Sequence, residues 1–132
     1  DPFVDRLVEL HAELLKVIKK YKPTRMAVED LFFARNVTTA IKVGQARGVI
    51  LLTAAQLKIP VDEFTPLQVK QAITGYGRAG KGQIQRMIQM QFKLKKRITP
   101  DDAADAVAIA VTGAASLNFK RRVKKTVRQD TK

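Results

Sequence analysis

The sequence predicts an α/β domain that contains fewer strands than such a domain needs. Helical and strand-like patterns alternate along the 132 residues, and 45% of the residues are hydrophobic, which is enough for a core. Only two short segments, residues 25–30 and 60–65, read as strands. Two strands cannot form a stable open sheet under several helices. We therefore expect the missing strands to come from a partner or from an N-terminal part that has been removed from this chain.

The first half of the chain predicts a helix on either side of the first strand. Apolar residues at 3, 7, 10, 14 and 18 have helical spacing, so residues 1–21 should form a helix that ends at Lys22 and Pro23. Asn36 is a suitable N-cap for a second, long helix over residues 37–58. Because that helix joins the two predicted strands, the strands should run parallel.

The second half predicts three further helices. Residues 66–74 and 83–94 form the first two, and the third begins at Thr99 or Asp101. The loop between the first two, "GYGRAGKG", is rich in glycine and basic, but it does not match the P-loop motif. We expect one domain over residues 1–118, followed by a loosely ordered basic tail over 119–132.

The charge of the chain indicates a polyanionic partner. There are 25 Lys and Arg against 12 Asp and Glu, which gives a formal charge of +13. Residues 64–100 contain eight basic residues and no acidic one. Nucleic acid is the expected partner, and an acidic membrane surface is the lesser alternative. The chain has no cysteine, no segment long enough to span a membrane and no visible signal peptide, so we expect a soluble protein of the cytoplasm.

Three acidic residues stand out against this basic background. Glu29 lies at the C-terminal end of the first predicted strand, where parallel α/β sheets gather functional side chains. Asp102 and Asp105 are three residues apart at the start of a helix and share one face. Oxygen ligands from such carboxylates suit Mg²⁺ or Mn²⁺. Spacing alone favours helix capping by these aspartates, which would need no metal.

Three longer stretches carry a resemblance to a known family. They are "AVEDLFFARNVTTAIKVGQARG", "TPLQVKQAITGYGRAGKGQIQRMI" and "DDAADAVAIAV". Together they resemble the RuvC family of crossover junction endodeoxyribonucleases, the bacterial Holliday junction resolvases, over roughly residues 3–117. The resemblance implies a ribonuclease H-like fold, here without the N-terminal strands of the central sheet.

The resemblance also implies a metal site with two ions. Glu29, Asp102 and Asp105 match three of the four acidic positions that hold Mg²⁺ in the family, and Mn²⁺ is the alternative ion. The fourth is an aspartate in a "GIDPG" motif on the family's first strand, and this chain has no match for it. We therefore expect metal-dependent cutting of junctions by paired nicks in the complete protein and little activity in this chain alone.

Other residues are assigned to DNA by the same resemblance. Phe32 is expected to stack on or wedge between bases at the branch point, and Arg35 suits a phosphate. Lys70 and Lys81 match positions that meet the DNA backbone, and Arg78 lies in the same basic loop as Lys81.

The resemblance further implies partners and a location for the protein. A twofold homodimer would form through the helix that carries Gly44 and Gly48, although these glycines equally fit packing on the sheet. Four-way junction DNA and branch-migration motor proteins are the other expected partners, and the nucleoid is the expected place of action. Two alternatives stay open at this stage: a non-catalytic junction-binding module, and a basic structural protein of the ribosome or nucleoid.

Overall fold

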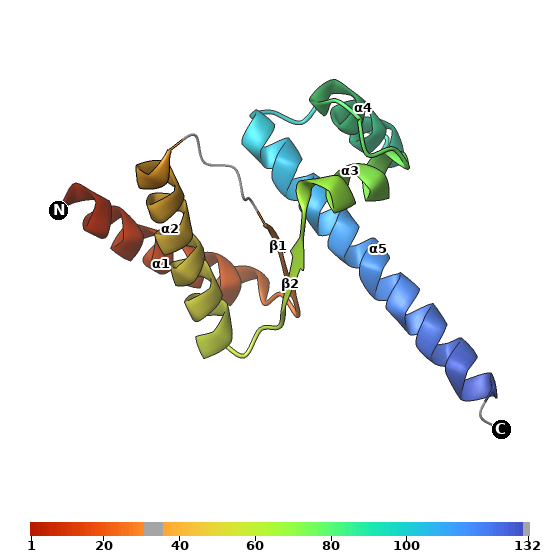
Figure 1. The fold of residues 1–132 in the computed structure, drawn as a ribbon, viewed down its shortest axis with the longest axis horizontal. Coiled ribbons are helices and arrows are strands. Elements are labelled where there is room, and N and C mark those ends of the chain that lie inside the picture. Colours follow the sequence, from red (N-terminus) through yellow and green to blue (C-terminus); the bar gives the residue numbers. More distant parts are fainter. Residues whose placement is uncertain (31–35, 131–132) are drawn as a thin grey trace. The chain divides into compact units, whose positions relative to one another are not determined.

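A computed structural model describes residues 1–30 and 36–130 of the chain. Within them the order is α1 (Pro2–Tyr21), β1 (Met26–Glu29), α2 (Val37–Gln56), β2 (Val61–Phe64), α3 (Pro66–Thr74), α4 (Lys81–Gln91) and α5 (Asp101–Asp130) (Figure 1). This alternation of helices and strands confirms the predicted order of elements. None of the helices in the described part of the chain is long and apolar enough to cross a membrane.

The two strands pair in parallel, as predicted. Met26 N–H donates to Pro60 C=O at 2.9 Å, and Asp30 N–H donates to Phe64 C=O at 2.7 Å. Both partners advance by four residues from one bond to the next, which is the register of a parallel pair. In the described residues the sheet has these two strands alone.

The chain divides into two compact units. Of the described residues, one unit contains 1–26 and 36–62, and the other contains 27–30 and 63–130. In the first unit α1 packs against α2, and the predicted apolar face of α1 lies against its neighbour with Ile18 buried. His11 Nδ1 lies 2.8 Å from the buried Thr53 Oγ1, which donates its own hydrogen to Val49 C=O. His11 is therefore the donor in this bond, and it fixes α1 to α2.

Side-chain caps and a glycine with positive φ define the ends of several helices. Asn36 caps α2 by accepting from Thr39 N–H at 2.8 Å, which confirms the predicted cap. Thr65 and Gln68 form a reciprocal capping box at the start of α3, and Gly75, with φ of 74°, ends that helix. α4 begins at Lys81, two residues before the predicted start, because the Gln83 side chain accepts from Gly80 N–H at 3.1 Å.

The predicted basic tail is helical over its described part. α5 continues as a helix to Asp130. Residues 119–130 contain neither Gly nor Pro, and six of the twelve are Lys or Arg, which are good helix formers, so no helix-breaking residue ends the helix at residue 118. The predicted boundary between a domain at 1–118 and a tail at 119–132 stays a prediction.

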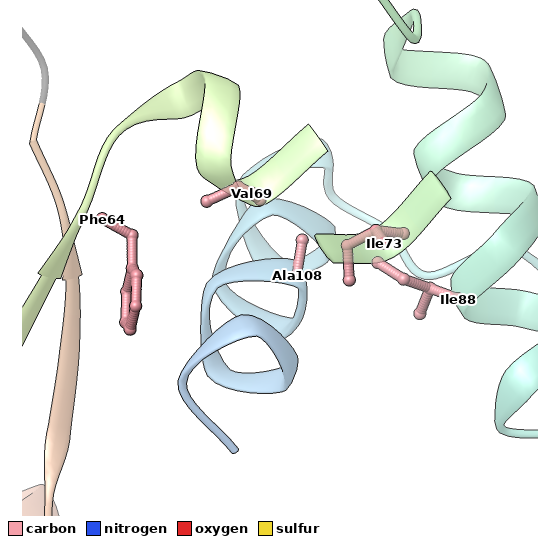
Figure 2. Close-up of a cluster of buried hydrophobic side chains, with 5 residues drawn as sticks. All are labelled: Phe64, Val69, Ile73, Ile88 and Ala108. Carbon is pink, nitrogen blue, oxygen red and sulfur yellow. The ribbon is translucent and has the colours of Figure 1, made fainter. Parts of the chain in front are cut away.

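The core of the second unit lies where α3, α4 and α5 meet the end of β2. Figure 2 shows its five buried side chains, which come from all four elements: Phe64, Val69, Ile73, Ile88 and Ala108. Small residues bring α5 close to the strands, since a Cβ added at Gly113 would lie only 3.1 Å from Ala27 Cβ. The core therefore fixes the position of α5 relative to the strand ends.

Replacing Ile88 by Ala should lower the free energy of unfolding by about 2–5 kcal/mol, because it opens a cavity in this core. Ile88 is 1% exposed, whereas its neighbour Met87 is 39% exposed. Met87→Ala is the matched control and should change stability by about 0.5 kcal/mol or less. Urea unfolding followed by circular dichroism measures both; equal losses in the two variants would contradict the core assigned to Ile88.

Candidate active site

Two predicted carboxylates and two predicted lysines line one pocket of about 290 Å³ in the second unit. Glu29 comes from the end of β1, Lys70 from α3, Lys81 from the first turn of α4 and Asp105 from the second turn of α5. The apolar part of the wall comes from the core, through residues such as Val69 and Ala108. Four elements thus direct acidic and basic groups to one place.

The basic loop before α4 is anchored to α3. Thr74 Oγ1 accepts from Tyr76 N–H at 3.1 Å and donates to Lys70 C=O at 2.7 Å. A Cβ on Gly77 would lie 2.7 Å from Leu67 Cδ1, so a larger residue there would have to displace the Leu67 side chain. The anchored loop delivers Lys81 to the pocket, while Arg78 is exposed on the same loop and does not line it.

Lys81 forms ion pairs at the start of α5. Its Nζ lies 3.5 Å from Asp101 Oδ2 and 3.7 Å from Asp105 Oδ2. The buried Gln85 donates from Nε2 to Asp101 Oδ1 at 3.1 Å. Sequence reasoning considered Asp101 only as a cap and did not single out Gln85. The sequence carries no signal for this cluster, because its members lie on two helices and meet only through the packing of α4 on α5.

The environment changes the pKa of two of these carboxyl groups in opposite directions. Burial raises the pKa of Glu29 above its ordinary value, the negative charge of Asp105 raises it further, and Lys70 opposes both effects. The hydrogen bond from Gln85 lowers the pKa of Asp101, and the positive charge of Lys81 adds to this effect. Glu29 and Asp105 are therefore close enough to repel each other, while Asp101 is stabilised as an anion.

The structure brings together some of the predicted site residues and not others. Glu29, Lys70, Lys81 and Asp105 share the pocket, whereas Asp102 is exposed in the first turn of α5 and does not line it. In residues 1–30 and 36–130, no three His, Cys, Asp or Glu side chains converge as a metal site would require. Phe32 and Arg35 lie outside the described residues.

Comparison with known proteins identifies the family. Residues 1–113 match the family model described as crossover junction endodeoxyribonuclease RuvC. This match covers most of the chain. The chain belongs to the RuvC family.

Curated RuvC relatives agree with this assignment over most of their length. The protein of that name from Desulfitobacterium hafniense is 55% identical over 122 residues, which are 92% of this chain and 74% of the relative. The one from Halothermothrix orenii is 52% identical over 119 residues, covering 90% of this chain and 72% of the relative.

A solved structure also matches. T. thermophilus RuvC in complex with a Holliday junction substrate is 38% identical and superposes with a TM-score of 0.86, covering 91% of this chain and 73% of that one. These matches confirm the α/β, ribonuclease H-like fold and the predicted endonuclease class. Members of this family are metal-dependent nucleases. The family assignment excludes a structural protein of the ribosome or nucleoid.

Glu29→Gln should stabilise the metal-free protein at neutral pH. Because the pKa of Glu29 is raised in the folded state, folding is penalised above that raised pKa and unaffected below the ordinary value of 4.5. The gain of the variant over the unmutated chain should therefore appear as the pH rises through this window. Urea unfolding at a series of pH values, with a chelator present, measures it. A variant that is less stable at pH 7, or a gain that is independent of pH, would contradict the raised pKa.

Proposed function

We propose that this chain acts on four-way DNA junctions as a metal-dependent endonuclease that resolves them by paired nicks during recombination and repair. The observation that carries the proposal is the pocket in which Glu29 and Asp105 lie among Lys70 and Lys81. The lysines attract a phosphate, and the carboxylates provide the oxygen ligands for cations that cutting a phosphodiester requires. The structure of the T. thermophilus relative in complex with a Holliday junction substrate supports the choice of DNA.

Mg²⁺ is the proposed metal, with two ions in the complete site and Mn²⁺ as a substitute. Glu29 and Asp105 fit as ligands because they are oxygen donors that repel each other in a partly buried pocket, and a cation would relieve this repulsion. Asp102 is the proposed third ligand. When bound, the two ions would supply an activated water and stabilise the leaving oxygen. The fourth carboxylate predicted from the family has no counterpart among the residues described.

The proposed DNA contacts extend outward from the pocket. Lys70 and Lys81 lie at the carboxylates, so they suit the phosphate nearest the cut, and the exposed Arg78 suits a phosphate farther along the backbone. Phe32 and Arg35 are proposed to contact the branch point, Phe32 by stacking on unpaired bases. Their chain position just after Glu29 supports this assignment.

A homodimer through α2 is also part of the proposal. Ile41, Gly44, Gly48 and Leu52 fall on one stripe of this helix. Ile41 is 55% and Leu52 57% exposed, and a Cβ added at either glycine would meet no atom within 4 Å. Such a stripe permits close helix packing across a twofold axis, which would place two active sites on one junction. Motor proteins of branch migration and a location with the nucleoid rest on the family resemblance alone.

The decisive test of the enzyme is a hybrid. This chain is joined to the part of T. thermophilus RuvC that has no counterpart in it, and nicking of a four-way junction is assayed with Mg²⁺. The hybrid should cut, and Asp105→Asn should abolish cutting while junction binding without metal is retained, since lost negative charge cannot weaken phosphate contacts. The 132-residue chain alone should bind the junction and cut it negligibly, because only two predicted ligands share its pocket.

Glu13→Gln is the control for this experiment, because Glu13 is exposed, pairs with Lys16 on α1 and does not line the pocket. It should leave cutting unchanged. Undiminished cutting by the Asp105→Asn hybrid would remove Asp105 from the site. A hybrid that binds junctions tightly but never cuts would favour the non-catalytic junction-binding module.

Gly48→Leu should convert the proposed dimer to a monomer, because a large side chain on the α2 stripe prevents close approach of the second helix. Gly82→Leu is the matched control: it makes the same change at another glycine with open space around it, on α4. Sedimentation equilibrium at several protein concentrations measures both. The interface would have to lie elsewhere if Gly48→Leu left the mass unchanged or if Gly82→Leu reduced it equally.

A further inference from the structure

The start of α5 holds a lysine inside an acidic cluster that the proposed chemistry does not explain. Lys81 and Gln85 face Asp101 and Asp105 across the contact between α4 and α5, and all four side chains are linked by the ion pairs and the hydrogen bond. The proposed nuclease function assigns no role to Asp101, although it uses Lys81 and Asp105. Of the two carboxylates that pair with Lys81, Asp101 is nevertheless the nearer: its Oδ2 lies 3.5 Å from Lys81 Nζ, whereas Asp105 Oδ2 lies 3.7 Å away.

We propose that Asp101 is a positioning residue that retains Lys81 beside Asp105 and withholds it from phosphate until DNA and metal occupy the site. This inference rests on the proposed function and names a further residue that regulates it. Lys81 with its two carboxylates carries a net charge of −1, so the cluster does not attract a phosphate as an unpaired lysine would. The cation has to leave Asp101 before it can contact the DNA backbone.

Gln85 orients the Asp101 carboxylate that retains Lys81. Its side chain is 5% exposed, and its amide donates to Asp101 Oδ1, while the Lys81 pair uses Oδ2. Each oxygen of Asp101 therefore has its own partner, and the carboxylate is oriented from a buried point. The ion pairs themselves are half-exposed, with Lys81 54% accessible. Half-exposed ion pairs are weak, so Lys81 can be exchanged for another cation at small cost.

The position of Lys81 in its own helix favours the same arrangement. It occupies the first residue of α4, where the helix dipole is unfavourable for a positive charge. Asp101 and Asp105 compensate for this by lying in the first two turns of α5, where the dipole favours negative charge. Removing Asp101 leaves Lys81 paired with Asp105, the more distant of the two carboxylates, and the ammonium becomes available to phosphate.

The test is a double-mutant cycle on the 132-residue chain with a four-way junction in the presence of a chelator. Asp101→Asn should tighten binding and steepen the log–log dependence of affinity on salt by about 0.9, the value for one added phosphate contact. The same substitution in a Lys81→Gln background should change neither quantity, because the cation that it releases is absent. Gln85→Met, which keeps the volume and removes the donor, should change binding in the same direction as Asp101→Asn but less.

Two results would overturn the proposal. An equal effect of Asp101→Asn in both backgrounds would show a general effect of negative charge on DNA, and weaker binding by Asp101→Asn would show that Asp101 presents Lys81 to the phosphate.

A second measurement needs no DNA. In ¹⁵N relaxation of lysine ammonium groups, Lys81 should become more mobile in Asp101→Asn, with exposed Lys96 as the internal reference. An unchanged Lys81 would refute the retention. The unmutated chain could also fail to bind any junction while Lys81 becomes more mobile in Asp101→Asn as expected. That result would count against the proposed function and leave the positioning role of Asp101 standing.

Discussion

The close packing of α5 on the rest of the second unit is the constraint on which the site depends. Ala104, Ala108 and Thr112 form a buried stripe of small residues along this helix, and Gly113 brings it to the strand at Ala27. Side chains of this size allow short distances between backbones, which larger residues would prevent. Because Glu29 ends the strand and Asp105 projects from the helix, the packing determines how near their carboxylates come. The packing of α5 thus sets the strength of the repulsion between the Glu29 and Asp105 carboxylates.

The elements of the fold could be predicted from the sequence because their signals are local. Asn36 before α2, Thr65 with Gln68 at α3 and the apolar face of α1 each specify a helix within a few residues. The start of α4 was misjudged because Gln83 looked like the first helical residue, whereas its side chain reaches back to Gly80. The helix beyond residue 118 does not follow from the sequence, because a charged segment at a chain end also fits a loosely ordered tail, although Lys and Arg favour helix.

The site could be predicted only in part. The sequence indicates Glu29, Lys70, Lys81 and Asp105 as candidate site residues, and the pocket brings these four together. The pairing of Lys81 with Asp101 could not be predicted, because the two are twenty residues apart and meet only through the packing of α4 on α5. Gln85 gave no chemical signal in the sequence, since a buried amide becomes informative only when its partner is known. Family resemblance indicates candidate site residues, and the tertiary structure shows which residues contact them.

The charges of the pocket explain how a basic protein can keep two carboxylates close together. Glu29 and Asp105 repel each other, which the raised pKa of Glu29 reflects, and without counter-charges this repulsion would oppose the packing of α5 against the strand end. Lys70 beside Glu29 and Lys81 beside Asp105 supply those counter-charges within the chain. A metal ion would replace them at the carboxylates, and the released lysines would then face a phosphate at the same pocket. The same positive charges can therefore stabilise the protein before substrate binds and hold the substrate afterwards, which links the stability of the fold to its readiness for DNA.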